Sequence, residues 1–178
     1  MSGKLPIYEV EEDILINLSE KNRLIIQSPT GSGKSTQVPQ ILYKNNVNKD
    51  GAILILQPRR IAARLLASRV AKELGTRLGD IVGYQVRLEN VSSENTRIKY
   101  VTEGVLLRML LSNPTLEVVN VVIFDEFHER HLYGDISLAR ILELQKTKRT
   151  DLKIIVMSAT LNIANLRSYL APCAEIDC

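Results

Sequence analysis

Short apolar runs alternate along the chain with longer stretches in which apolar residues recur every three or four positions. Continuous apolar runs of about five residues are typical of parallel strands covered on both faces. The predicted strands cover residues 23–28, 52–57, 83–87, 98–102, 118–124 and 152–157. The predicted helices cover residues 10–18, the stretch from about 35 to 45, and residues 61–74, 103–111, 135–146 and 162–170.

This alternation predicts an α/β fold with a mostly parallel central sheet and helices on both of its faces. We expect one domain over residues 23–178, with a lead-in helix within residues 1–22 packed on it. Ligands of parallel sheets bind beyond the carboxyl ends of the strands. Polar clusters follow five predicted strands, at residues 28–36, 58–60, 102–104, 125–128 and 158–160. We therefore expect these clusters to lie along one edge of the sheet.

The composition fits a globular protein with a sizeable core: of 178 residues, 45% are hydrophobic and 24% charged. A net charge of +3 is compatible with a polyanionic partner but does not argue for one. The only cysteines, Cys173 and Cys178, form no disulfide framework and favour a cytoplasmic location. No apolar run approaches the roughly 20 residues that span a bilayer, so we expect no membrane partner.

The glycine-rich loop after the first strand is the strongest motif in the chain. It comprises Thr30, Gly31, Ser32, Gly33, Lys34, Ser35 and Thr36. A strand, a tight glycine loop and a helix start together form an anion site, because backbone N–H groups and the helix dipole favour negative charge there. Lys34 can reach the β- and γ-phosphates of a nucleotide, and the Ser35 hydroxyl can ligate Mg²⁺. The pattern G-x-x-x-x-G-K-[ST] fits, with Ser28 in place of its first glycine; the flanking strand and helix argue against an ordinary flexible loop.

Two adjacent carboxylates, Asp125 and Glu126, follow the most apolar strand. Asp125 could hold the Mg²⁺ shell through water, and Glu126 could orient or deprotonate an attacking water. A helix start with acidic residues in its first turn is the simpler alternative.

Two histidines close behind the acidic pair invite a zinc interpretation, which the spacing excludes. His128 and His131 are three positions apart, whereas the pattern H-E-x-x-H places its histidines four apart. We interpret His128 as a polar link to Ser158 or Thr160 across the sheet edge, with an incidental hydrogen-bonded histidine as the alternative.

The second polar cluster and the helix behind it are basic, with Arg59, Arg60, Arg64 and Arg69. They look like a surface that contacts phosphates. The alternative is a solvated face with salt bridges to residues such as Glu73. Aromatic residues make up only 4% of the chain, which favours contact with a nucleic-acid backbone over base stacking.

Together these motifs resemble the first RecA-like domain of a superfamily 2 helicase of the DEAH/RHA group. The resemblance covers the chain from about Leu5 to Leu170. It rests on motif I (residues 31–36), motif Ia (57–64), motif Ib (102–104), motif II (125–130) and motif III (158–160). Phe127, where most of the group has alanine, resembles the bacterial HrpB-type branch.

The resemblance implies a role for each matching residue. Lys34 and Ser35 would bind the phosphates of ATP and Mg²⁺, Asp125 would serve the metal, and Glu126 would be the catalytic base. Coupling of hydrolysis to movement on the strand would fall to His128, Ser158 and Thr160. The nucleic-acid backbone, RNA in preference to DNA, would be contacted by Arg59, Arg60, Thr102, Glu103 and Gly104. Arg69 would lie beside the nucleotide base.

One family element has no counterpart in this sequence. Helicases of the group carry a second RecA-like domain with an arginine-rich motif, and nothing like that motif occurs here. A transition-state arginine is worth about 10³ to 10⁵ in rate in related phosphoryl-transfer enzymes. We therefore expect a piece of a longer helicase, which needs its second domain as a partner and which alone binds nucleotide weakly, hydrolyses it slowly and does not unwind a duplex.

Two other functions remain open at this point. The chain could be a nucleic-acid-binding module that uses nucleotide only as a structural ligand, or a P-loop NTPase with a role unrelated to nucleic acid. The motif Ia arginines and the motif Ib cluster argue against the second of these, through the resemblance alone.

Overall fold

The order of the elements along the chain is the predicted alternation of strands and helices. The computed structural model describes residues 5–159 and 163–178. Its strands are β1 (Arg23–Gln27), β2 (Ala52–Gln57), β3 (Val82–Val86), β4 (Glu89–Val91), β5 (Ile98–Thr102), β6 (Val119–Phe124), β7 (Lys153–Ser158) and β8 (Ala174–Asp177). Its helices are η1 (Pro6–Val10), α1 (Glu11–Glu20), α2 (Lys34–Lys44), α3 (Arg60–Glu73), α4 (Glu103–Ser112), η2 (Phe127–Glu129), α5 (Leu132–Thr147) and α6 (Ile163–Leu170).

The strands form one sheet in the order β4-β3-β5-β2-β6-β7-β1-β8. All neighbouring strands are parallel except β3 and β4, which form an antiparallel hairpin. The register places Gln27 beside Ser158 and Gln57 beside Thr102, so the last residues of neighbouring strands end level with one another. The prediction that the polar clusters share one edge of the sheet is confirmed.

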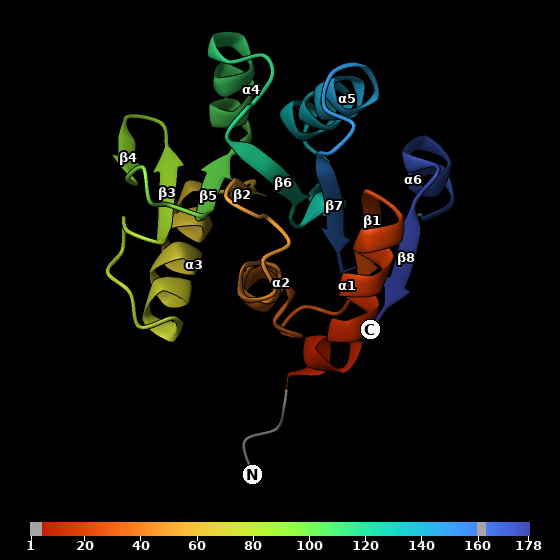
Figure 1. The fold of residues 1–178 in the computed structure, drawn as a ribbon, viewed down its shortest axis with the longest axis horizontal. Coiled ribbons are helices and arrows are strands. Elements are labelled where there is room, and N and C mark those ends of the chain that lie inside the picture. Colours follow the sequence, from red (N-terminus) through yellow and green to blue (C-terminus); the bar gives the residue numbers. More distant parts are fainter. Residues whose placement is uncertain (1–4, 160–162) are drawn as a thin grey trace.

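Helices cover both faces of the sheet, as predicted. Helices α1, α2 and α3 lie on one face, and α4, α5 and α6 lie on the other (Figure 1). The strands are apolar on both sides, so neighbouring residues of one strand enter different cores. In β1, Leu24 and Ile26 belong to the core beneath α1 to α3, whereas Ile25 belongs to the core beneath α4 to α6.

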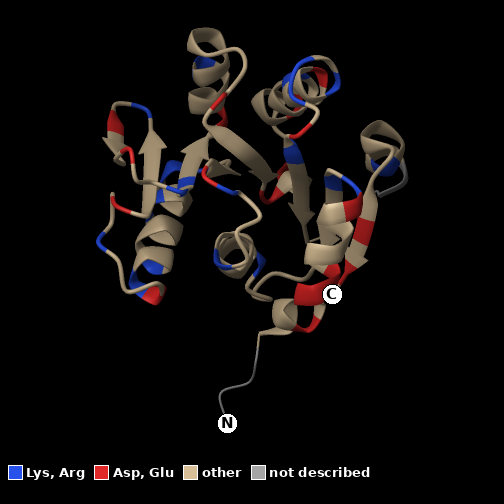
Figure 2. Cartoon of the chain, viewed as in Figure 1, with Lys and Arg blue, Asp and Glu red and all other residues tan. Residues whose placement is uncertain are grey.

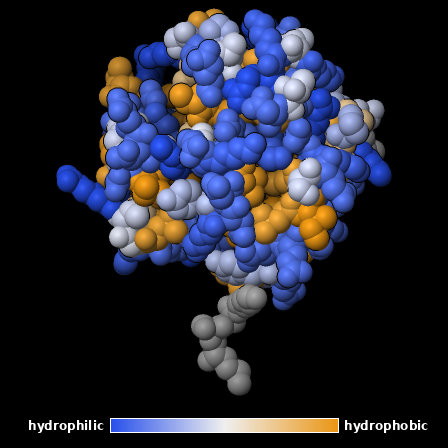
Figure 3. All heavy atoms as spheres, viewed as in Figure 1, coloured by the Kyte–Doolittle hydropathy of each residue, from blue (hydrophilic) through white to orange (hydrophobic). Residues whose placement is uncertain are grey.

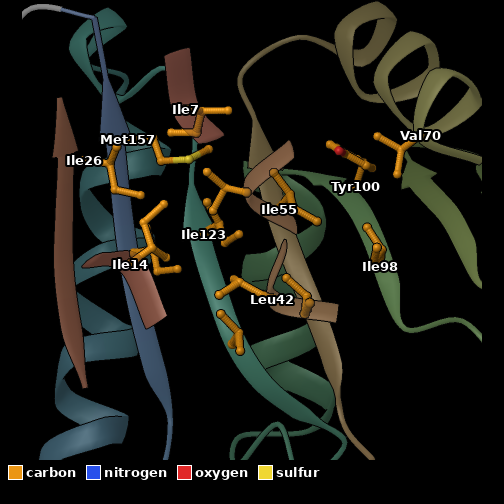
Figure 4. Close-up of a cluster of buried hydrophobic side chains, with 14 of the residues drawn as sticks. Ile7, Ile14, Ile26, Leu42, Ile55, Val70, Ile98, Tyr100, Ile123 and Met157 are labelled. Carbon is orange, nitrogen blue, oxygen red and sulfur yellow. The ribbon is translucent and has the colours of Figure 1, made fainter. Parts of the chain in front are cut away.

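The N-terminal segment packs against the core beneath α1 to α3. Ile14 and Leu18 of α1 are buried, and Ile7 of η1 joins them in the same core (Figure 4). Helix α1 begins with three acidic residues, and acidic residues recur along α1 and β8 in Figure 2, where lysine and arginine are spread over many elements.

The structure adds strands that the sequence pattern did not predict. Strand β4 has three residues, and β8 carries Glu175 and Asp177 in its four, so neither forms an apolar run. Helix α5 begins at Leu132, three residues before the predicted start at Asp135.

Hydrophilic atoms cover most of the face shown in Figure 3, with smaller hydrophobic areas between them. In the described part of the chain, no helix is both long enough and apolar enough to span a membrane.

Candidate nucleotide site and adjoining groove

The loop between β1 and α2 has the backbone geometry of an anion site. Gly31 and Gly33 have φ values of +85° and +94°, which side chains rarely tolerate. Helix α2 begins at Lys34, directly after Gly33. The loop therefore turns sharply and presents the first turn of α2, with its free N–H groups and positive dipole end, to the sheet edge.

Lys34 and the acidic pair meet at this edge although they lie far apart in the sequence. The Nζ atom of Lys34 lies 3.4 Å from Oε1 of Glu126, and the lysine side chain is only 3% exposed. Asp125 is also buried, at the end of β6. The prediction that these three residues converge is confirmed; their catalytic roles stay predictions.

Asp125 is held in place by hydrogen bonds from both of its flanks. Gln57 Nε2 donates to Oδ2, and the backbone N–H of Glu126 donates to Oδ1 at 2.9 Å. Leu56 pairs with Phe124, so Gln57 and Asp125 are the next residues on adjacent strands. Burial raises the pKa of Asp125 above its usual value, although hydrogen bonds from Ser35 and Gln57 act in the opposite direction.

The residues around Asp125 fit a Mg²⁺ ion that is bound together with phosphates. The raised pKa means that the buried charge of Asp125 is incompletely compensated, which a cation would correct. The Ser35 hydroxyl hydrogen-bonds Asp125, so the two oxygen ligands are adjacent. Among the described residues no group of three or more His, Cys, Asp or Glu side chains could hold a metal. Mg²⁺ needs few protein ligands where phosphates and water complete its coordination shell.

Glu126 adopts a strained backbone conformation. Its φ of +50° lies in the left-handed region, which is uncommon for residues other than glycine. The chain turns there from β6 into η2, and the carboxylate lies between Lys34 on one side and His128 Nδ1 at 3.4 Å on the other. Strain of this kind persists where the surrounding contacts hold it, and it is concentrated at functional sites.

The link from His128 to the end of β7 exists in part. The backbone N–H of Ala159 donates to His128 Nδ1 over 3.5 Å, a long contact. Ser158 is buried, and its carbonyl accepts a hydrogen bond from the N–H of Ser28 at 3.0 Å. The prediction for Thr160 lies outside the described residues. Motif II thus touches the end of β7, which in turn supports the start of the phosphate loop.

A groove of about 770 Å³ lies at the same sheet edge, beyond β2, β5 and β3. Three of the predicted nucleic-acid residues, Arg60, Thr102 and Gly104, line it. Arg87, from the turn after β3, and Arg108, from α4, line it as well. Neither arginine belongs to a motif: Arg108 lies one helical turn after Gly104 on the predicted helix 103–111, a signal that could have placed it beside motif Ib, whereas nothing in the local pattern places Arg87 there.

Two of the predicted nucleic-acid residues do not line this groove. The exposed guanidinium of Arg59 pairs with Glu129 at 2.9 Å. Glu103 is half-buried, and its Oε1 lies 2.7 Å from the position that a Cβ on Gly134 would occupy. Burial raises the pKa of Glu103. The structure thus turns the Glu103 carboxylate toward α5.

Arg69, the predicted base contact, lies on the exposed side of α3. Its Nε donates to Glu73 Oε1 at 2.9 Å, in an i,i+4 pair. Glu73 also accepts hydrogen bonds from Gln37 and Gln40 of α2 at 2.9 and 2.7 Å. The expected salt bridge to Glu73 is therefore present, and it connects Arg69 to the helix that follows the phosphate loop.

Comparisons with known proteins agree on one family. Residues 8–169 match the sequence profile of the DEAD/DEAH box helicases. The chain is 44% identical over 176 residues to an ATP-dependent RNA helicase HrpA of Borreliella burgdorferi and 45% identical over 169 residues to an ATP-dependent RNA helicase HrpB of Escherichia coli. These matches cover 98% and 94% of this chain but 21% of each relative, so the chain spans about a fifth of their length.

A solved structure shows the same fold. The crystal structure of the Escherichia coli DEAH/RHA helicase HrpB superimposes with a TM-score of 0.93 at 42% identity. The match covers 98% of this chain and 22% of that chain. The predicted resemblance to the DEAH/RHA group and to HrpB-type helicases is confirmed, and the identity to the HrpA relative is nearly the same.

Proposed function

Since this chain belongs to the DEAD/DEAH box helicase family, we propose that it is the ATP-hydrolysing motor domain of an ATP-dependent helicase. The observation that carries the proposal is the buried Lys34 ammonium 3.4 Å from Glu126, at the mouth of the phosphate loop and beside Asp125. This arrangement joins a phosphate cradle to a candidate general base, which is what hydrolysis of a terminal phosphate requires.

Each part of the site has a distinct task in this proposal. The backbone N–H groups of residues 30–36 and the Lys34 ammonium hold the phosphates of ATP. Ser35 and Asp125 would hold Mg²⁺, which neutralises charge that develops on the phosphates. Glu126 orients the attacking water and accepts its proton. Lys34 lies within reach of both phosphate and carboxylate, so a bound phosphate would draw it away from Glu126 and leave that carboxylate free to act.

The groove is the proposed path of a single nucleic-acid strand, with RNA favoured because the relatives are named RNA helicases. Its exposed arginines can contact phosphates without reading the sequence. We also retain Arg59 as a contact, since rearrangement of its exposed ion pair with Glu129 costs little. Glu103 fits this role less well, because its carboxylate faces α5 and would repel phosphate.

Coupling between the two regions would run through His128, Ser158 and Thr160, and His128 contacts the backbone N–H of Ala159 just after β7. Strand movement would follow from closure of this domain on a second RecA-like domain, which would also supply the transition-state arginine. Without it, the 178-residue chain should bind nucleotide weakly and turn it over slowly. We place the helicase in the cytoplasm, in keeping with its unpaired cysteines.

The binding step can be tested with two lysines of the same helix. Lys34→Ala removes a buried ammonium at the phosphate loop, whereas Lys44→Ala removes an exposed one at the opposite end of α2. Titration with a fluorescent ATP analogue and Mg²⁺ should show binding lost in Lys34→Ala and retained in Lys44→Ala. Equal binding by all three proteins would refute the nucleotide site.

The groove supports a second candidate function, a nucleic-acid-binding module in which nucleotide is only a structural ligand. The two functions predict different effects of the bound nucleotide on the affinity for RNA. In a protein that also contains the second RecA-like domain, a motor should change its affinity for a single-stranded RNA oligonucleotide when ATP replaces ADP, whereas a module should bind the RNA equally with either nucleotide or with none. Salt titrations run in the three states measure this directly.

A further inference from the structure

The segment that precedes α1 lies against the back of the phosphate loop. Ile7 is completely buried, and its backbone N–H donates to the carbonyl of Ser32 over 3.4 Å. A Cβ added at Gly33 would lie 2.9 Å from Leu5 Cδ1 and 3.4 Å from Ile7 Cγ2. The loop residue with the most demanding backbone conformation, φ +94°, is therefore enclosed by two side chains of this segment.

A polar contact joins the same segment to the first turn of α2. The hydroxyl of Tyr8 donates to Oε1 of Gln37. The Nε2 of Gln37 in turn donates to Thr36 Oγ1 at 3.1 Å and to Glu73 Oε2 at 2.9 Å. Burial, together with the nearby charges of Glu73 and Glu11, raises the pKa of Tyr8, so the phenol stays a donor at neutral pH. Gln40 Nε2 also lies 3.4 Å from Oε1 of Gln37, so Tyr8 is one of several groups that orient the Gln37 amide.

The loop itself has few internal contacts that could fix its shape. The backbone N–H of Ser32 reaches the carbonyl of Pro29 only over 3.4 Å. Within the described residues, the buried hydroxyls of Ser28 and Ser32 have no hydrogen-bond partner. N–H groups that are to bind an anion cannot also hold the loop in shape. The loop must therefore be ordered by its surroundings, or its ordering on nucleotide binding costs affinity.

We propose that residues 5–10 act as a brace that holds the phosphate loop in its binding shape, with Tyr8 as a positioning residue for nucleotide binding. Leu5 and Ile7 support Gly33 from behind, and Tyr8 fixes Gln37, the residue that follows motif I. The proposal rests on the proposed function, because it assumes that the loop binds nucleotide. Tyr8 touches no phosphate; it acts by ordering the loop before the ligand arrives.

Tyr8→Phe tests the brace because it deletes one hydroxyl and keeps the ring. The matched control is Tyr43→Phe, a change at a half-buried tyrosine near the far end of α2 that packs against the same core. Affinity is measured with a fluorescent ADP analogue and Mg²⁺ on the whole 178-residue chain. A hydrogen bond of ordinary strength predicts roughly three- to tenfold weaker binding for Tyr8→Phe and no change for Tyr43→Phe.

A second measurement separates positioning from general stability. In the nucleotide-free protein, amide hydrogen exchange of residues 29–35 should be faster in Tyr8→Phe than in the wild type, and unchanged in Tyr43→Phe. Thermal unfolding of the two variants without nucleotide should agree. Weaker binding that tracks a lower unfolding temperature in both variants would assign the effect to stability and overturn the brace.

A third variant, Lys34→Ala, distinguishes failure of the brace from failure of the nucleotide site. If Lys34→Ala abolishes binding of the ADP analogue while Tyr8→Phe binds like the wild type, the brace is wrong and the nucleotide site stands. If Lys34→Ala binds like the wild type, the nucleotide site is wrong, and the brace falls with it.

Discussion

The buried charge of Asp125 should make the free protein less stable than it could be. Asp125→Asn keeps the size of the side chain and removes its negative charge. Lys34 is not left unpaired by this change, because Glu126 remains 3.4 Å away. The new amide has one acceptor oxygen for the two donors at this position, Gln57 Nε2 and the backbone N–H of Glu126, so a lost hydrogen bond offsets part of the gain from removing the charge. We therefore expect Asp125→Asn to stabilise the nucleotide-free chain at neutral pH.

The size of the effect follows from general values. Single stabilising substitutions commonly yield about 0.5–2 kcal/mol. For a chain of 150–250 residues, 1 kcal/mol shifts the unfolding temperature by about 2–4 °C. Asp125→Asn should therefore unfold roughly 1–8 °C higher than the wild type in the absence of ligand. The same variant should lose the stabilisation that Mg²⁺ and nucleotide give the wild type, because it lacks the carboxylate proposed to serve the metal.

The pH dependence of unfolding tests the sign of this stability change a second time. Burial raises the pKa of the Asp125 carboxyl in the folded state above its value in the unfolded state. The stability that Asp125 contributes is therefore complete at a pH below the unfolded-state pKa, and it is lost as the pH rises through the folded-state pKa. The advantage of Asp125→Asn should thus be absent in acid and grow toward neutral pH. Differential scanning fluorimetry across that range measures it.

Asp151 is the matched control because its pKa shift has the opposite sign. Its hydrogen bond with Arg149 lowers the pKa of this exposed carboxyl. Its stabilising contribution is present above the unfolded pKa and lost as pH falls through the folded one. Asp151→Asn should therefore unfold slightly below the wild type at neutral pH. If Asp125→Asn also unfolds lower there, or if its advantage persists in acid, burial does not dominate at Asp125 and the reasoning fails.

Three further predictions concern the loop, the sheet edge and the groove. Gly33→Ala should lower the unfolding temperature more than Gly31→Ala, because both have positive φ but only the first meets a neighbour within 4 Å; thermal unfolding compares them. Gln57→Ala should cost about 1–3 kcal/mol in chemical unfolding, because it removes the side-chain donor to Oδ2 of the buried Asp125. Arg108→Ala should weaken RNA binding in filter assays and reduce the slope of log affinity against log salt by about 1.

Each of these has its own control or refuting result. Equal losses in the two glycine variants would show that Leu5 does not restrict the loop. A neutral Gln57→Ala would show that water replaces the donor. Arg140→Ala alters an exposed arginine that pairs with Glu143 on α5 and does not line the groove, so its salt slope should match that of the wild type.

The convergence of the motifs could be predicted from the sequence because it follows from topology alone. Once strands 23–28 and 118–124 are parallel members of one sheet, the residues after them share an edge whatever the strand order. That Lys34 and Asp125 also lie near one another depends on the strand order, in which only β7 separates β6 from β1. The existence of these helices and the apolar cores of these strands followed from local periodicity, although α5 begins three residues before its predicted start.

Contacts that depend on register or on the rotation of a helix could not be predicted. Gln57 donates a hydrogen bond to Asp125 because Leu56 of β2 pairs with Phe124 of β6. The apolar sequence of a strand does not reveal this register. Glu103 turns to Gly134 because α4 and α5 pack together, and a motif match carries no information on that. Tyr8 looked like a residue of an ordinary packing segment, since its partner Gln37 comes from another element.

The central claim is that Glu126 performs hydrolysis at a site where Lys34 holds the phosphates. Single-turnover phosphate release, with the protein in excess over radiolabelled ATP and Mg²⁺, tests it on Glu126→Gln, with Glu129→Gln as the control for loss of a nearby carboxylate. We predict nucleotide affinity close to wild type in both variants, and a rate that falls at least about 10²-fold in Glu126→Gln alone. Phosphate release by Glu126→Gln at the wild-type rate would contradict the account.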